Sequence, residues 1–223
     1  MFALLVTCVT LSAEPEPAPW QKQESAHLAN IKQITTDFAR AGEGYFSPDG
    51  KTIIFQAEEK GTGNPFYQIF TQDLATGRTT RVSPGAGKTT CSFFSPDGKR
   101  VIFRSDRKKK DHLQLYVINT DGSGERALTD DLNWVQWGPY WYKDGKHIIY
   151  AAADHSNPTV RPNYDLYWMN VDSGSKKRIT FAPGADVLPV FSPDGDRVMW
   201  TSTRDGRQPA QLYIADFTPP KEE

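Results

Sequence analysis

Short apolar and alternating runs recur along the chain, and each group of runs contains the same kind of turn. The turns read Phe46-Ser-Pro-Asp-Gly-Lys, Phe94-Ser-Pro-Asp-Gly-Lys, Trp141-Tyr-Lys-Asp-Gly-Lys and Phe191-Ser-Pro-Asp-Gly-Asp. Their aspartates, Asp49, Asp97, Asp144 and Asp194, are 48, 47 and 50 residues apart. A repeat of this length holds one four-stranded antiparallel sheet. The pattern therefore predicts an all-β fold, a β-propeller of about four four-stranded antiparallel blades.

The second repeat shows the expected strands most clearly. An inner strand at residues 90–94 leads into Pro96-Asp97-Gly98, where proline fixes φ, aspartate bonds its own backbone and glycine supplies a positive φ. Residues 100–105 and 114–119 are then the second and third strands, and residues 125–129 a short outer strand. The same spacing places the blades near residues 42–83, 90–129, 137–180 and 187–217.

The fourth repeat ends after its third strand, because the two prolines in residues 218–223 prevent another paired strand. Residues 30–35, Asn-Ile-Lys-Gln-Ile-Thr, precede the first repeat and align with the outer strand that ends at Thr180. We therefore expect this amino-terminal strand to complete the carboxy-terminal blade and to close the ring.

Residues 27–217 resemble the Pro-Asp propeller repeats of the TolB-like secreted and periplasmic proteins. The resemblance rests on the Phe-Ser-Pro-Asp-Gly-Lys turns, on Asp121-Gly-Ser-Gly and on the Leu-Thr or Ile-Thr ending of each repeat. It implies a propeller but no single function, since similar blades occur in translocation proteins, in sensor-like proteins and beside hydrolase domains. Six blades are usual in that family, so four repeats imply a small ring, missing blades or two chains that combine.

The composition fits one exported domain. The net charge of −1 removes the usual argument for nucleic-acid binding, and 38% hydrophobic residues are enough for one core. The basic run of Arg104 and Arg107-Lys-Lys-Lys110 is expected to be a solvated loop.

The apolar residues 2–13 are too short to span a bilayer and are typical of a signal-peptide core with cleavage near Ala13. The sequence therefore predicts a periplasmic or secreted protein without a stable membrane span. The expected segments are a signal-peptide-like stretch at 1–13, a proline-rich leader at 14–27, the propeller at 28–217 and a tail at 218–223. Cys8 is a poor match to a lipidation signal, and Cys91, beside Phe93 and Phe94, is expected to be a small core residue.

No motif in the chain indicates catalysis. Gly-x-Ser-x-Gly does not occur, and the phosphate-loop pattern fails because Val82 stands where a glycine is required. The four histidines, His27, His112, His147 and His155, show no paired spacing. The sequence therefore predicts no cofactor, no metal and no enzymatic activity.

Binding residues are expected in the connections from each outer strand to the next inner strand. The connection at residues 130–137 carries Trp134 and Trp137 beside Asp131 and Asn133, a combination typical of peptide or sugar contacts. The alternative is that both indoles pack between blades. The other connections contribute the candidates Glu43, Lys88 and Asp186. A proline-stiffened loop at residues 154–163 is expected to project at the rim.

These features predict a non-catalytic module that binds a protein or peptide of the cell envelope, as a monomer or a strand-sharing dimer. Two alternatives stay open. Trp134 and Trp137 also suit a carbohydrate or small ligand at the channel mouth. A lyase or hydrolase would need histidines and carboxylates that converge in the channel.

Overall fold

The computed structural model describes residues 18–204 and 209–221. The predicted signal segment at residues 1–13, with Cys8, lies outside the described residues. The contacts divide the chain into one compact unit that ends at Thr36 and a second that spans Asp37–Glu223. The described part of the first unit holds the short helix α1 (Pro19–Glu24) and irregular chain. Among the described residues, no helix combines the length and apolarity that a membrane crossing needs.

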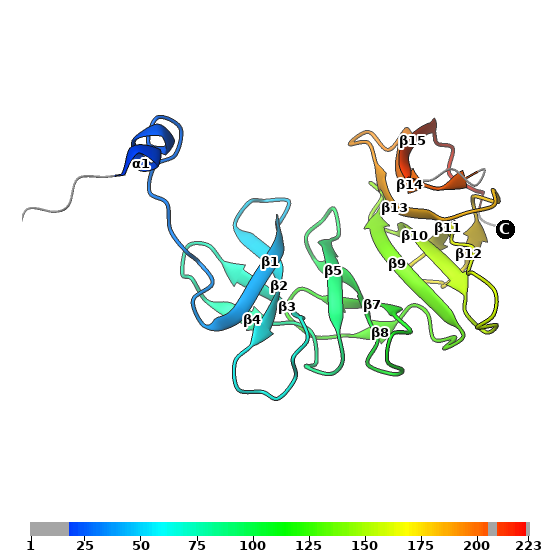
Figure 1. Cartoon of the computed structure of the whole chain (residues 1–223), viewed down its shortest axis with the longest axis horizontal. Coiled ribbons are helices and arrows are strands. Elements are labelled where there is room, and N and C mark those ends of the chain that lie inside the picture. The colour runs from blue at the N-terminus through cyan, green and yellow to red at the C-terminus, as the bar shows by residue number, and fades with distance from the viewer. Residues whose placement is uncertain (1–17, 205–208, 222–223) are drawn as a thin grey trace, which may run out of the picture. The chain divides into compact units, whose positions relative to one another are not determined.

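The second unit is built of four antiparallel sheets, which we call blades 1 to 4 in chain order (Figure 1). Blade 1 contains β1 (Phe38–Phe46), β2 (Thr52–Glu59), β3 (Gln68–Asp73) and β4 (Thr79–Arg81). Blade 2 contains β5 (Thr89–Phe94), β6 (Arg100–Ser105), β7 (Gln114–Asn119) and β8 (Arg126–Ala127). Blade 3 contains β9 (Trp134–Trp141), β10 (His147–Asp154), β11 (Asp165–Asn170) and β12 (Lys176–Arg178). Blade 4 contains β13 (Asp186–Phe191), β14 (Arg197–Ser202) and β15 (Gln211–Asp216). The all-β prediction with four antiparallel blades is confirmed.

The repeated turn is held by its own side chains. In blade 1, Asp49 Oδ1 accepts hydrogen bonds from the Ser47 hydroxyl at 2.7 Å and from the Lys51 backbone N–H at 3.1 Å. Blades 2 and 4 repeat this arrangement with Ser95 and Ser192. Blade 3 has Tyr142 in place of the serine, and there His147 Nδ1 lies 2.6 Å from the Asp144 carboxylate. The turn sequence therefore fixes the pairing of the first two strands in every blade.

Each inner strand carries a β-bulge at the same place. The bulged residues have positive φ angles of 50° to 54° and are Glu43, Cys91, Gly138 and Leu188. Each lies six residues before the aspartate of the following turn, at a shift in the register with the second strand. Bulges bend a strand and change the direction in which side chains point. Three of the four positions hold residues other than glycine in a conformation that favours glycine.

The blades pack face to face in chain order, and each boundary has its own apolar core. Ile54 and Ile69 meet Val101 and Phe103 between blades 1 and 2. Ile102 and Leu115 meet Ile148 and Tyr150 between blades 2 and 3. Ile149 and Trp168 meet Val198 and Trp200 between blades 3 and 4. These cores follow from strands that are apolar on both faces, as a sheet between two other sheets requires.

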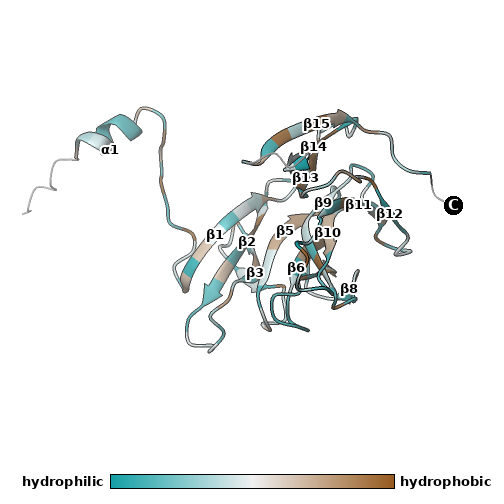
Figure 2. Ribbon diagram, turned by 45° about the vertical axis from the view of Figure 1, so that its right-hand side comes forward, coloured by the Kyte–Doolittle hydropathy of each residue, from teal (hydrophilic) through white to brown (hydrophobic). Residues whose placement is uncertain are grey.

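The structure does not confirm the predicted closure of the ring. Residues 31–36 are in no strand, and the sheet of blade 4 is β13-β14-β15, with no outer strand among the described residues. Residues 30–35 lead directly into blade 1, whereas blade 4 packs on blade 3. Ile31 and Ile34, the apolar positions of the expected strand, are 69% and 39% exposed. Leu212 and Ile214 on β15 are correspondingly exposed, and Figure 2 shows hydrophobic positions on that strand.

Candidate functional site

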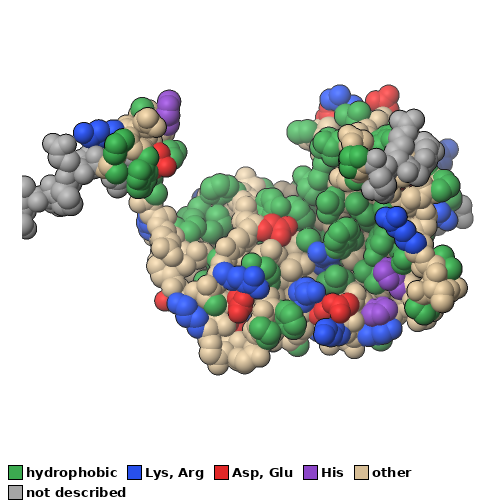
Figure 3. Space-filling view, in the orientation of Figure 1, with side chains coloured by type: hydrophobic (Ala, Val, Ile, Leu, Met, Phe, Trp, Pro, Cys, Tyr) green, Lys and Arg blue, Asp and Glu red, His purple; other side chains and the backbone are tan. Residues whose placement is uncertain are grey.

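A groove runs along the ends of the inner strands of blades 1 to 3. It has a volume of about 330 Å³ and is lined almost entirely by aromatic residues and prolines. We call it the inner-strand groove; its residues are Tyr45, Phe46, Pro48, Phe93, Phe94, Ser95, Pro96, Tyr140 and Trp141. Figure 3, in the orientation of Figure 1, shows hydrophobic side chains on the face that presents β5, β9 and β13.

The aromatic side chains of the groove contact one another from blade to blade. The rings of Tyr45 and Phe93 lie 4.7 Å apart, and those of Phe93 and Tyr140 lie 5.3 Å apart, edge to face. Trp141 donates a hydrogen bond from Nε1 to the Phe93 carbonyl at 3.2 Å. These contacts hold the walls in place, while Phe46 stays 70% exposed. A preformed apolar groove with exposed aromatic groups is typical of a binding surface.

Charged and polar groups lie beside this groove, at the bulges. We call Glu43, Cys91, Arg104, Trp137 and Tyr164 the bulge cluster. Arg104 extends from β6, where its Nε donates to Thr90 Oγ1 at 3.0 Å, and its guanidinium lies 5.0 Å from the centre of the Trp137 ring. Its Nη1 is buried and has no hydrogen-bond partner among the described residues. Arg104 is therefore not part of a solvated basic loop, because it is half-buried against blade 3.

Burial and the charge of Arg104 shift the pKa values of two groups in the bulge cluster. Burial raises the pKa of the Glu43 carboxyl, and the positive charge of Arg104 opposes this rise. Burial also raises the pKa of the Cys91 thiol. Cys91 is half-buried at the bulge beside Arg104, rather than a small core residue as predicted. A raised thiol pKa keeps Cys91 protonated at neutral pH, so it is a poor nucleophile.

Two histidines that the sequence left apart meet at the edge of the bulge cluster. The ring centres of His112 and His155 are 6.2 Å apart, and His155 Nε2 lies 2.9 Å from the Tyr164 hydroxyl. Burial, with the nearby His112, lowers the pKa of His155. The sequence offered no signal for this pair, since 43 residues and the boundary between two blades separate them. Among the described residues, no group of three or more His, Cys, Asp or Glu side chains is arranged to hold a metal ion.

The two predicted tryptophans lie on opposite faces of blade 3. Trp134 packs on the core between blades 2 and 3, where its ring meets Tyr167 edge to face at 6.1 Å. Trp137 packs on the core between blades 3 and 4 and lies 6.2 Å from Tyr164. The structure therefore does not bring the two indoles into one site, and each packs at a different blade boundary.

The other predicted residues are also distributed. Asp131 and Asn133 are exposed in the connection before Trp134, and Asp131 Oδ1 accepts a hydrogen bond from the Asn133 N–H at 2.9 Å. Lys88 lies 3.5 Å from Asp111 in a partly exposed ion pair. Asp186 is 1% exposed, and its carboxylate accepts hydrogen bonds from Trp200, Ser202 and Arg204. Of the predicted set, only Glu43 and Trp137 lie in the bulge cluster.

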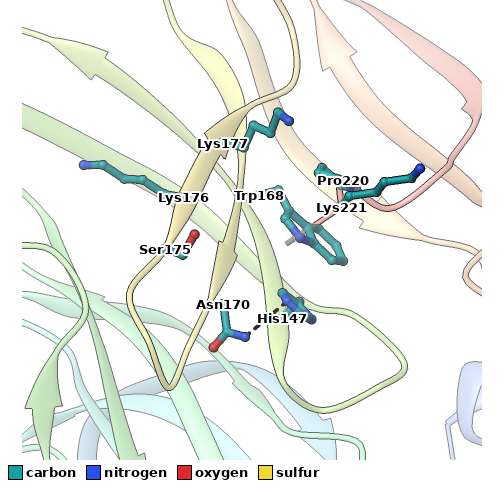
Figure 4. Close-up of a pocket in the computed structure, with 8 residues that line it drawn as sticks. All are labelled: His147, Trp168, Asn170, Ser175, Lys176, Lys177, Pro220 and Lys221. Atoms are coloured by element: carbon teal, nitrogen blue, oxygen red, sulfur yellow. Dashed lines mark hydrogen bonds between the residues drawn. The ribbon is translucent and has the colours of Figure 1, made fainter. Parts of the chain in front are cut away.

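A further cavity of about 290 Å³ lies between β12 and the carboxy-terminal segment (Figure 4). Trp168 lines it and stacks on His147 at 4.7 Å between ring centres. Lys176, Lys177 and Lys221 also line it, but in Figure 4 the amino groups of Lys176 and Lys221 point to opposite sides. Cations that diverge in this way do not form a site for a single anion.

The chain was compared with known protein families, sequences and structures. No protein-family model matches the chain. The peptidase YuxL of Bacillus subtilis, itself uncharacterized, is 27% identical over 212 residues, which cover 76% of this chain and 31% of that protein. Dipeptidyl-peptidase 5 of Porphyromonas endodontalis is 30% identical over 93 residues, covering 42% of this chain and 12% of that protein. The chain thus spans less than a third of the length of these relatives.

The solved structure of TolB from Acinetobacter baumannii superposes with a TM-score of 0.62 at 26% identity, covering 82% of this chain and 42% of that one. The fold is a β-propeller fold, a series of consecutive antiparallel blades that have four strands in blades 1 to 3 and three strands in the described part of blade 4. Within that class it is a TolB-like propeller fold, as the repeats predicted.

Proposed function

We propose that this chain is a non-catalytic binding module that takes up an extended peptide segment of a partner protein in the inner-strand groove. The observation that carries the proposal is the groove itself, an aromatic and proline surface assembled from three blades. Grooves lined by aromatic rings bind extended and proline-rich peptides, because the rings pack against flat apolar side chains without a large loss of entropy.

The bulge cluster adds a polar requirement beside the groove, since Glu43 of the cluster and Tyr45 of the groove both lie on β1. Arg104 Nη1 has no hydrogen-bond partner in the part of the chain that the structure describes, and Glu43 is the carboxyl whose pKa the charge of Arg104 affects. A carboxylate on the bound segment, either an acidic side chain or a chain end, would give this N–H the partner that it lacks within the described residues. The favoured ligand is therefore a short segment with aromatic or proline residues followed by a carboxylate.

A non-catalytic role is supported by the residues of the site. Cys91 stays protonated, and no Gly-x-Ser-x-Gly occurs in the sequence. The matches to relatives that carry peptidase names cover 12% and 31% of those proteins, and a shared propeller does not by itself assign an activity. The apolar stretch at residues 2–13 supports a periplasmic or secreted location, with an envelope protein as partner.

The proposal is tested by selecting peptides from a random phage-displayed library and measuring their affinities by calorimetry. We expect selected peptides to lose about tenfold or more in affinity for Phe46→Ala, which removes the most exposed ring of the groove. The matched control is Leu212→Ala, because Leu212 is equally exposed, at 70%, but lies on blade 4.

Amidation of the peptide carboxyl and Arg104→Gln should weaken binding to a similar degree and should not weaken it further in combination. Peptides that bind Phe46→Ala and Arg104→Gln as tightly as the wild type would contradict the proposal. Selection of no peptide above background would do the same.

A further inference from the structure

The connection that precedes β9 and the loop after β10 form a second surface, on the opposite face of blade 3 from Trp137. A cavity of about 370 Å³ lies under the loop that follows Asp154, and another of about 290 Å³ lies beside Asp130 and Asp131. Trp134 and Tyr167 line both cavities and so form their common wall. The two cavities therefore make one continuous surface with an aromatic pair at its centre.

We infer that this surface is a binding site for a neutral oligosaccharide, with one sugar unit on either side of Trp134. Indole and phenol rings offer flat apolar faces to the C–H groups of a pyranose ring, while their edges leave the hydroxyls free. Each cavity has a volume near the lower end of the range for small-ligand sites, which suits one or two sugar rings. This site is independent of the inner-strand groove.

Polar side chains line the larger cavity together with the aromatic pair. In the larger cavity, Asp165 accepts a hydrogen bond from Asn163 Nδ2 at 2.8 Å and pairs with Arg178 Nη2 at 2.6 Å. Asp154 lines the same cavity and is exposed. Carboxylates, an amide and a guanidinium together offer both donors and acceptors, as hydroxyl groups require.

The smaller cavity holds a buried acceptor without a partner. Gln136 lines it and is 4% exposed, and its Oε1 accepts no hydrogen bond within the part of the chain that the structure describes. A buried acceptor of this kind has lost its hydration without gaining a hydrogen bond, which destabilises the fold. A ligand hydroxyl that donates to Gln136 Oε1 would supply the missing hydrogen bond. A substitution of Gln136 therefore tests whether the ligand binds in this cavity.

The charges of the lining favour an uncharged ligand. Four carboxylates face the two cavities, from Asp130, Asp131, Asp154 and Asp165. Three cations accompany them, from Arg161, Lys176 and Arg178, and Arg178 is already paired with Asp165. An anionic sugar would therefore meet more negative than positive charge, whereas hydroxyls bond to either.

The experiment is calorimetry and saturation-transfer NMR of the full chain with neutral di- to tetrasaccharides of glucose, mannose, galactose and N-acetylglucosamine. At least one member should bind the wild type, and Trp134→Ala should lower its affinity about tenfold or more. Trp134→Phe keeps an aromatic face and should retain most of the affinity. Trp20→Ala is the control, because Trp20 is an exposed tryptophan that lines neither cavity, and it should bind as the wild type does.

Gln136→Leu separates a binding role from a structural one. The substitution removes an unpaired buried acceptor, so it should leave the free energy of unfolding unchanged or raise it, while it weakens saccharide binding several-fold. The inference is overturned if no saccharide binds the wild type, or if Trp134→Ala and Gln136→Leu both bind with unchanged affinity.

Discussion

The guanidinium of Arg104 lies over the ring of Trp137, 5.0 Å from the ring centre, although Arg104 belongs to β6 of blade 2 and Trp137 to β9 of blade 3. Arginine in this position attracts the negative face of the indole, and the contact gains strength where water is excluded. The pair therefore links blades 2 and 3 within the bulge cluster.

The charge of Arg104 should control the titration of Glu43. Burial raises the pKa of Glu43 and Arg104 limits the rise, so Arg104→Gln should raise this pKa further. Carbon-detected NMR of the Glu43 carboxyl measures it directly. Arg107→Gln is the control, because Arg107 is paired with Glu125 at 2.7 Å. An equal pKa in Arg104→Gln and the wild type would show that the two groups are not coupled.

Asp186 should contribute to the free energy of unfolding, because its carboxylate is buried within blade 4. It accepts from Trp200 Nε1 at 3.0 Å and pairs with Arg204 at 2.9 Å while 2% of its side chain is exposed. Asp186→Ala leaves these donors without an acceptor and should cost about 3 kcal/mol in the free energy of unfolding.

The control for this substitution is Asp172→Ala. Asp172 pairs with Arg100 at 2.7 Å but is 60% exposed, so its loss should cost about 1 kcal/mol or less. Urea unfolding of both variants gives the comparison. Equal losses would show that the enclosure of Asp186 does not strengthen its contacts.

The burial of His155 beside His112 should make stability depend on pH. Burial and the nearby His112 lower the pKa of His155 below its ordinary value of 6.5, while Asp154 opposes the shift. The unfolded chain then binds a proton more readily than the folded protein, so stability is lost as the pH falls below 6.5 and levels off below the folded pKa.

Urea unfolding across this pH range checks the effect in the wild type and in His155→Gln, which should show a smaller loss. His27→Gln is the control, since His27 is exposed and lies outside the blades. A loss of the same size in the wild type and in His155→Gln would assign the pH dependence to other groups.

Deletion of the residues before Asp37 should leave the blades folded. All the buried hydrophobic residues of the described chain lie at or beyond Ile53, and residues 31–36 pair with no strand. The melting temperature of the shortened chain should therefore stay within about 2 °C of the full chain, since no core contact is lost. A large drop, or aggregation, would show that residues 30–35 complete blade 4 in solution.

Local patterns were sufficient to predict the blades. The turn that contains Asp97, the apolar second strands and the outer-strand endings each lie within one repeat, so their geometry is decided by neighbours in the sequence. The closure depended instead on contacts between the two ends of the chain. Residues 30–35 do carry the sequence pattern of an outer strand, but this local pattern does not specify the sheet edge with which they would pair.

The candidate sites were predictable only in part, for the same reason. The sequence pattern groups Trp134 and Trp137 in one connection, whereas both lie on β9, three residues apart, and the alternation of a strand places such positions on opposite faces. The meeting of Arg104 with Trp137, and of His112 with His155, crosses the boundary between blades. No spacing within a repeat carries that information, because it arises from the packing of one sheet on the next.

The bulge that recurs in every inner strand holds a different residue type in each blade. A carboxyl at Glu43, a thiol at Cys91, no side chain at Gly138 and an isobutyl group at Leu188 occupy the same backbone geometry, with nearly equal φ angles. The ladder holds side chains of different chemistry at three of these positions, whereas at Gly138 an added Cβ would lie 3.1 Å from Leu188 Cδ2. The groups that differ between blades are thus presented by one shared backbone geometry.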